Sequence, residues 1–145
     1  IIIAIDNYKP SFYIYVPADF EGMIHLLPGK NPTESLTIDK NGIGYFNTHG
    51  EVNLKVMQGE NNISNALNQY GARTLIFKLA DSLNYRAIEI TCFEVFKDHA
   101  YGSSPWNQPH GTCLDEQAFI QMIKSGVIDS SRLVQQTYPV IRNKE

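Results

Sequence analysis

The chain contains little of what usually identifies a protein's function. Its 145 residues include two cysteines, and 12 basic against 15 acidic side chains give a formal net charge of -3. No run of five or more like charges occurs, and no stretch approaches the roughly 18 apolar residues that a membrane-spanning helix requires. The acidic balance and an isoelectric point near 5.8 argue against a nucleic-acid-binding protein, because such proteins normally present a basic face.

The common catalytic motifs are also missing. The sequence has no glycine-rich phosphate loop, no Walker motif, and neither the G-x-S-x-G nor the H-E-x-x-H pattern. Their absence weighs against an enzyme and indicates no cofactor. No repeat, low-complexity segment or Gly/Ser/Pro linker divides the chain, so a single β-rich domain spanning residues 1–145 is expected, and a domain of this size folds without a cross-link.

The chain begins Ile1-Ile2-Ile3-Ala4-Ile5, without an initiator methionine. Five apolar residues fit a first β-strand. They also fit the end of a removed N-terminal signal or anchor segment, and both interpretations remain open.

The first part of the chain reads as short strands separated by turns. Lys40-Asn41-Gly42 lies between two of these strands, and Asn-Gly in that position predicts a hairpin, because both residues tolerate positive φ. The expected strands are Ser11–Val16, Gly22–Leu27, Ser35–Asp39, Gly44–Asn47 and Glu51–Met57.

The middle of the chain has a different pattern. Asn61, Asn62 or Ser64 could cap a short helix that ends at Gly71. The two longest predicted strands follow, Ala72–Leu79 and Tyr85–Phe96. The second of them carries apolar residues on both faces, which indicates a central strand covered on both sides.

The clearest helix is expected at about Leu114–Lys124. Thr112 and Asp115 have the spacing of a capping box, and Gly126 is the expected stop. Strands followed by one late helix predict a mainly β fold, an antiparallel β-sandwich or small barrel with one C-terminal helix. The alternative is an α+β fold, an antiparallel sheet with that helix on one face.

Two short passages resemble a known group of proteins. Val16-Pro17-Ala18-Asp19-Phe20-Glu21-Gly22 and the passage from Leu36 to Ile43 are similar to the two signatures of a family of small exported bacterial β-rich domains of unknown function. The similarity covers residues 12–48, about a quarter of the chain, and its motifs consist largely of turn residues. The resemblance implies an exported β-rich fold and no known activity.

One segment concentrates the residues that can form cross-links. Cys92, His99, His110 and Cys113 fall within 22 residues. Cys92 lies near the end of a predicted strand and Cys113 at the start of the predicted helix, so a disulfide would close the loop between them. The alternatives are two buried thiols, a zinc site made by all four residues, and a thiol enzyme. In the last case Cys113 would be the nucleophile and His110 its base.

The same segment carries aromatic residues among small polar ones. Tyr101, Trp106, Asn107 and His110 are candidate binding residues, because rigid rings beside adaptable hydrogen-bonding groups suit the recognition of a carbohydrate or a protein. The sequence therefore favours a non-catalytic binding or accessory domain of the bacterial cell envelope, located in the periplasm or at the cell surface. A small hydrolase or thiol enzyme, and a structural or interaction subunit of an oligomer, are the alternatives.

Overall fold

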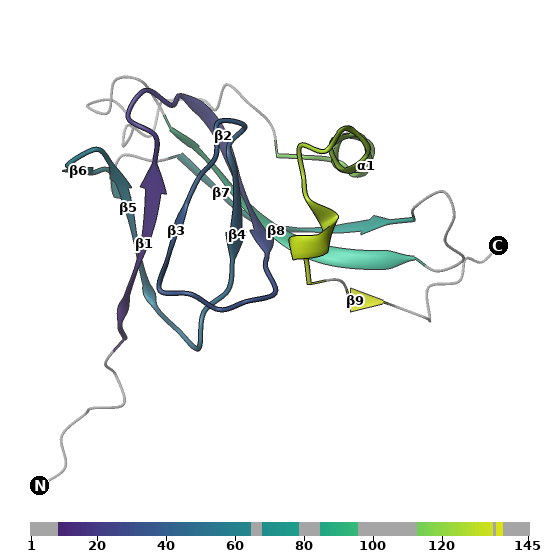
Figure 1. Cartoon of the computed structure of the whole chain (residues 1–145), viewed down its shortest axis with the longest axis horizontal. Helices are drawn as coiled ribbons and strands as arrows, with labels where there is room; N and C mark the ends of the chain where they lie inside the picture. The colour runs from purple at the N-terminus through teal and green to yellow at the C-terminus, as the bar shows by residue number, and fades with distance from the viewer. Residues whose placement is uncertain (1–8, 65–67, 79–84, 96–112, 135, 138–145) are drawn as a thin grey trace, which may run out of the picture.

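The structure, a computed structural model, contains two β-sheets packed face to face (Figure 1). It describes residues 9–64, 68–78, 85–95, 113–134 and 136–137. Sheet A has the strand order β3-β1-β5-β6, and sheet B has the order β4-β2-β8-β7, with β9 paired to β8. The elements are β1 (Ser11–Val16), β2 (Gly22–Pro28), β3 (Ser35–Thr37), β4 (Ile43–Phe46), β5 (Asn53–Gln58), β6 (Asn61–Asn62), β7 (Asn68–Phe77), β8 (Arg86–Val95), α1 (Glu116–Ser125), a 3-10 turn (Ser130–Arg132) and β9 (Gln136–Thr137).

The predicted fold class, mainly β with a sandwich and one C-terminal helix, is confirmed. The strand directions differ from the expectation, because both sheets are mixed rather than wholly antiparallel. β1 runs parallel to β3 and to β5, and β2 runs parallel to β4 but antiparallel to β8. Parallel neighbours need a connection that leaves the sheet and returns, and here the chain makes these connections through the opposite sheet.

The hairpin predicted at Lys40-Asn41-Gly42 is wrong for this reason. The Asp39 carboxylate accepts hydrogen bonds from the backbone N–H groups of Asn41 (2.8 Å) and Ile43 (3.0 Å), and Gly42 has φ +80°. The turn therefore forms with the expected chemistry. It carries the chain from β3 in sheet A to β4 in sheet B, instead of folding the two strands together.

The passage Val16–Gly22 makes the equivalent crossing from β1 to β2. The Phe20 N–H donates to the Pro17 carbonyl (3.0 Å), and the buried Gln58 amide donates to the carbonyls of Pro17 and Phe20, both at 2.9 Å. A Cβ atom on Gly42 would lie 3.0 Å from the Phe20 ring and against the Met23 carbonyl. The two crossings thus stack on each other, which makes β1 and β3 parallel in one sheet and β2 and β4 parallel in the other.

The predicted short helix ending at Gly71 is also wrong. Residues from Asn68 onward form β7, and Gly71 (φ +90°) lies where the register with β8 shifts, at a β-bulge. Glycine is favoured there for the same positive φ that it supplies at a helix end. The two long strands are confirmed, since β7 and β8 pair antiparallel over ten residues each.

Sheet B is covered on both faces. Its inner face packs against sheet A in a cluster that includes Phe12, Ile14, Ile24 and Phe93. Its outer face packs against α1 and the segment after it, in a second cluster that contains Leu27, Ile43, Leu75, Phe77, Ile88, Ile90, Leu114, Phe119, Ile128 and Leu133. The expectation that Tyr85–Phe96 contains a central strand is therefore confirmed for β8, whose even-numbered and odd-numbered apolar residues belong to different clusters.

Helix α1 stops at the predicted Gly126 but starts two residues later than the predicted Leu114, with Asp115 as its N-cap instead of the N3 partner of Thr112. The Asp115 carboxylate accepts from the Ala118 N–H (2.8 Å) as the N-cap, and Gly126 ends the helix with φ +85°. Thr112, the other half of the predicted capping box, lies outside the described residues. Within the described part of the chain, no helix is both long and apolar enough to cross a membrane.

Candidate functional site

The predicted disulfide between Cys92 and Cys113 is present, with the two Cα atoms 5.9 Å apart. Cys92 belongs to β8, and Cys113 lies just before α1. The bond therefore ties sheet B to the root of the helix that covers it. It also closes a covalent ring that includes the predicted aromatic segment, Tyr101–His110.

The disulfide bears on two alternatives from the sequence. A zinc site made by Cys92, His99, His110 and Cys113 needs two thiolates, and a thiol enzyme needs a free Cys113. Both sulfurs are engaged in the bond in this structure. His99 and His110 lie outside the described residues, and residues 9–64, 68–78, 85–95, 113–134 and 136–137 contain no group of three His, Cys, Asp or Glu side chains able to hold a metal ion.

A buried histidine lies beside the disulfide. His25 of β2 is the register partner of Cys92 on β8, and it is 6% exposed. Its Nε2 accepts a hydrogen bond of 3.1 Å from the backbone N–H of Leu114, the residue after Cys113. Burial lowers the pKa of His25 from 6.5 to about 4, because a buried imidazolium loses its hydration. A neutral imidazole therefore fixes the helix root to sheet B, and its accepting nitrogen is already used.

The candidate binding residues Tyr101, Trp106, Asn107 and His110 lie outside the described residues. Their role in binding stays a prediction.

The outer face of sheet A presents aromatic side chains. Phe12, Ile14 and Val16 of β1 are buried, so the alternation of a strand places Tyr13 and Tyr15 on the opposite face. The two tyrosine rings are stacked, with centroids 6.1 Å apart and an interplanar angle of 17°. We call the outward side chains of β1 and their register partners the tyrosine face: Tyr13, Tyr15, Ser35, Thr37, Lys55 and Met57.

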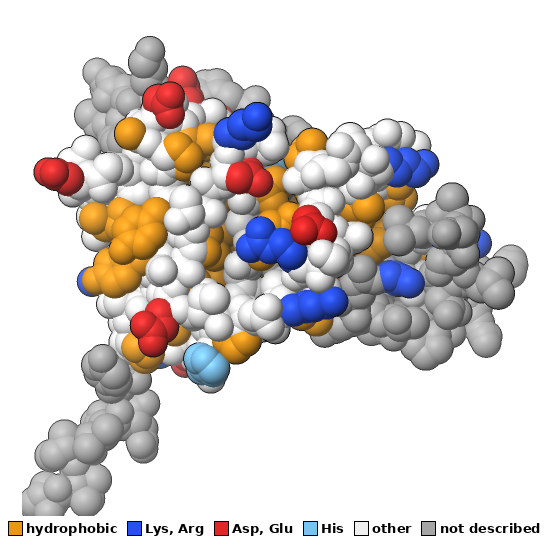
Figure 2. Space-filling view, viewed as in Figure 1, with side chains coloured by type: hydrophobic (Ala, Val, Ile, Leu, Met, Phe, Trp, Pro, Cys, Tyr) orange, Lys and Arg blue, Asp and Glu red, His pale blue; other side chains and the backbone are white. Residues whose placement is uncertain are grey.

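The tyrosine face is open to solvent. Tyr15 is 43% exposed, and Tyr13, Lys55 and Met57 are half-buried by one another's edges. Figure 2 shows an apolar patch on this side of the molecule, over β1 and β5 as drawn in Figure 1. Aromatic rings on a rigid sheet suit stacking against the apolar face of a sugar ring or packing against a protein side chain.

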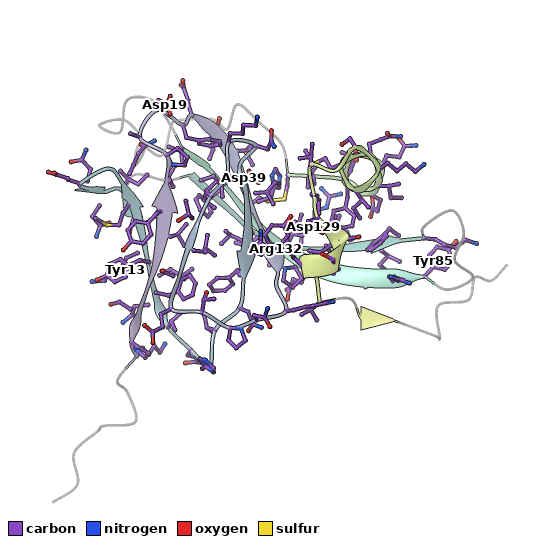
Figure 3. The ribbon with its side chains drawn as sticks, viewed as in Figure 1. Tyr13, Asp19, Asp39, Tyr85, Asp129 and Arg132 are labelled. Carbon is purple, nitrogen blue, oxygen red and sulfur yellow. A yellow bond between two sulfur atoms is a disulfide. The ribbon has the colours of Figure 1, made fainter. Side chains whose placement is uncertain are left out.

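A basic pocket lies next to the tyrosine face, where the edge strands β3 and β4 come together. It has a volume of about 270 Å³, and we call it the basic pocket; its lining residues are Gly29, Lys30, Asn31, Thr33, Ser35, Leu36, Thr37, Tyr45 and Arg132. The Arg132 guanidinium lies 4.0 Å from the centroid of the Tyr45 ring, a cation–π contact that holds it in place. Figure 3 shows Arg132 beside Asp129 near the middle of the view, with Tyr13 at its left.

Asp129 forms the acidic neighbour of this pocket. Hydrogen bonds from the Ser131 hydroxyl and N–H, followed by the positive charges of Arg132 and Lys30, hold the pKa of Asp129 below its usual value. The backbone N–H of Asp129 donates to the Tyr45 hydroxyl (2.8 Å). The 3-10 turn is therefore fastened to Tyr45 of β4 at both ends, by the Asp129 N–H before it and by the Arg132 guanidinium at its last residue.

Two further cavities are larger but less distinctive. One of about 410 Å³ lies where β8 separates from β2, and its lining includes Leu26, Thr91 and Val134. The other, about 610 Å³, is open at the start of β1 and is lined by residues such as Pro10, His49 and Glu51. Neither of these two cavities has a lysine or arginine among its lining residues.

Sequence reasoning missed the basic pocket and the tyrosine face. The alternation in Ser11–Val16 contained the signal for the second, because it places both tyrosines of a strand on one side. Nothing local could reveal the first, since Lys30, Tyr45 and Arg132 come from separate parts of the chain.

Comparison with known proteins adds one solved structure. The chain is similar to a protein from Bacillus anthracis described as a putative lipoprotein, with 15% identity, a TM-score of 0.40, and coverage of 79% of this chain and 90% of that chain. Similarity at this level assigns no activity or location to this chain. No family model and no curated protein matches the sequence.

Proposed function

We propose that this protein is a non-catalytic binding domain of the bacterial cell envelope, exported from the cytoplasm, that recognises a carbohydrate through the tyrosine face. The observation that carries the proposal is the pair of stacked, exposed tyrosines, Tyr13 and Tyr15, on the uncovered side of a rigid sheet. Two aligned rings form a flat platform, and such a platform loses little conformational entropy when a sugar ring stacks on it.

The disulfide supports export. Disulfides form and persist in oxidising compartments such as the periplasm and the cell surface, and they are rare in the cytosol. Cys92–Cys113 has the Cα separation of an ordinary structural bridge. The resemblance of residues 12–48 to exported bacterial β-rich domains points in the same direction.

The chemistry of the described residues favours binding over catalysis. Cys113 is occupied by its bond to Cys92, and His25 is buried and already accepts from Leu114. The candidates that are open to solvent are aromatic, hydroxyl and basic side chains, which hold ligands. We propose that Tyr101, Trp106, Asn107 and His110 contribute to the same recognition function.

Export is tested by fractionating expressing cells and alkylating the protein before and after reduction. We expect an extracytoplasmic protein whose two cysteines react only after reduction. A cytoplasmic protein with two free thiols would contradict the proposed location.

Binding is tested by co-sedimentation with insoluble cell-wall polysaccharide. The Tyr13→Ala and Tyr15→Ala variants should each bind at least about threefold more weakly, since a stacked ring contributes about 1 kcal/mol. Tyr85→Ala is the matched control, because Tyr85 is similarly exposed at 37% but lies outside the tyrosine face. Equal retention of all three variants and the wild type would rule out the tyrosine face as the binding surface.

The interaction-subunit alternative has one observation in its favour. β7 is the terminal strand in the path of sheet B, it is ten residues long, and its Ile76 is 45% exposed. A free strand edge of this length can pair with a strand of another chain. Sizing chromatography over a range of concentrations tests this, and a strict monomer counts against it.

A further inference from the structure

We infer that the basic pocket binds the anionic group of an acidic polysaccharide whose sugar rings lie across the tyrosine face. This inference rests on the proposed function, because it names the class of carbohydrate recognised at that surface. It adds a second, charged subsite to the aromatic one.

The two sites are continuous. Ser35 and Thr37 of β3 are the register partners of Tyr13 and Tyr15, and both residues also line the basic pocket. Adjacent strands lie about 4.8 Å apart, so one strand's width separates the tyrosines from the rim of the pocket. Figure 3 shows Tyr13 at the left of the view and Arg132 near its middle, so a ligand that contacts both has to extend around the edge strand β3, past Ser35 and Thr37.

The charge of the pocket selects an anion. Lys30 and Arg132 both line it, and Asp129, whose pKa both cations help to lower, already accepts two hydrogen bonds from Ser131. Within the described part of the chain neither cation forms a salt bridge, in a protein whose formal net charge is -3. A carboxylate or phosphodiester would supply the missing negative charge and accept charge-assisted hydrogen bonds.

The Arg132 guanidinium and the backbone of Lys30 are held in position before any ligand binds. Arg132 is stacked on Tyr45, and its carbonyl accepts a hydrogen bond of 3.0 Å from the Lys30 N–H. The Asn47 amide donates to the Gly29 carbonyl (2.9 Å), which fixes the start of the same loop. Because an arginine fork that is already oriented loses less entropy on binding, it suits bidentate recognition of a carboxylate.

The surroundings favour a sugar over an acidic peptide. The hydroxyl-bearing residues Thr33, Ser35 and Thr37 surround the cations, and the neighbouring platform is flat and aromatic. Sugar hydroxyls pair with such groups while the ring stacks. A peptide strand would instead need a free backbone edge or apolar pockets for its side chains.

Calorimetry with oligogalacturonate, at low and physiological salt, tests the inference. A polysaccharide whose sugar units are joined by phosphodiesters serves as the phosphodiester probe, poly-glutamate as the peptide probe, and an uncharged oligosaccharide as the neutral probe. We expect binding of at least one of the two acidic glycan-type polymers, weakened by salt. Arg132→Ala and Lys30→Ala should each reduce it by about tenfold, while Lys40→Ala, an exposed cation outside the pocket, should leave it unchanged.

Arg132→Lys separates charge from geometry and guards against a folding defect in Arg132→Ala. It should retain part of the affinity, and its melting temperature should match that of the wild type. Pocket variants that bind like the wild type, or a wild type that binds poly-glutamate but neither glycan polymer, would overturn the inference. If the pocket variants have no effect but Tyr13→Ala and Tyr15→Ala still weaken binding, the proposed function stands alone; if none of the four matters, both fail.

Discussion

The two sheets of this protein are built to different requirements. Sheet B is covered on both faces, by sheet A on one side and by α1 on the other, and it carries the disulfide and the buried His25. Among the described residues, sheet A is covered on one face only, and its other face presents Tyr13 and Tyr15 to solvent. The difference indicates that sheet B provides the stability of the molecule and that sheet A is available for recognition.

This contrast makes predictions about stability. Substitutions on the outer side of sheet B should destabilise the protein strongly. Substitutions on the outer side of sheet A should change binding and leave stability nearly unchanged.

The largest effect is expected from Phe119→Ala. Phe119 is fully buried between α1 and sheet B, with its ring centroid 4.8 Å from that of Phe77. Removing a buried phenylalanine ring costs about 3–5 kcal/mol of unfolding free energy. Urea denaturation measures it, and a loss below about 1 kcal/mol would mean that α1 contributes little to sheet B.

The next effect comes from removing the disulfide. The Cys92→Ala/Cys113→Ala double variant should lose about 3 kcal/mol, because the bond constrains the unfolded chain over a separation of 21 residues. Denaturation of the wild type with and without reductant gives the same comparison. An unchanged midpoint would show that the helix root is held by packing alone.

His25 should make stability depend on pH. Its folded pKa is about 4 against 6.5 when unfolded, so below pH 6.5 the unfolded state binds the proton more readily. The contribution of neutral His25 to the free energy of unfolding is therefore fully present above pH 6.5 and decreases as the pH falls toward 4. The total decrease is about 2–3 kcal/mol.

The His25→Gln variant is the control for this titration. Glutamine offers an acceptor for the Leu114 N–H but does not titrate, so the decrease between pH 6.5 and 4 should be smaller than in the wild type. Parallel pH profiles for the two proteins would contradict the prediction.

The smallest stability effect is expected from Tyr15→Ala. Its side chain is 43% exposed on the uncovered face of sheet A, and substitutions at such positions change stability by about 0.5 kcal/mol or less. Thermal unfolding beside the binding assay completes the comparison. A large loss of stability would show that the tyrosine face is structural.

Local features of the fold could be predicted from the sequence. The strand at Ser11–Val16 and the helix stop at Gly126 each depend on a few neighbouring residues. The central position of β8, covered on both faces, could be predicted because apolar residues occupy both faces of this one segment.

Features that depend on distant residues could not be predicted. The Asn41-Gly42 turn has the residues of a hairpin turn. The two strands that flank it nevertheless lie in different sheets, because Phe20 contacts Gly42 and β3 pairs with β1. Gly71 likewise has the positive φ of a helix end, while pairing with β8 makes it part of a strand. The disulfide could be anticipated because two cysteines admit one pairing, whereas the stacking of Arg132 on Tyr45 has no counterpart in local sequence.

The parallel pairing of β1 has a consequence for how the protein acquires its shape. β1 pairs in parallel with β3 and with the more distant β5, and neither partner is the next strand in the chain. β8 pairs with β9, Gln136–Thr137, which lies near the end of the chain. Contacts of such long range form slowly. On the proposed route of export, a chain that emerges N-terminus first would complete sheet B only after Gln136–Thr137 had crossed, so a slow-forming architecture would itself keep the polypeptide competent for secretion.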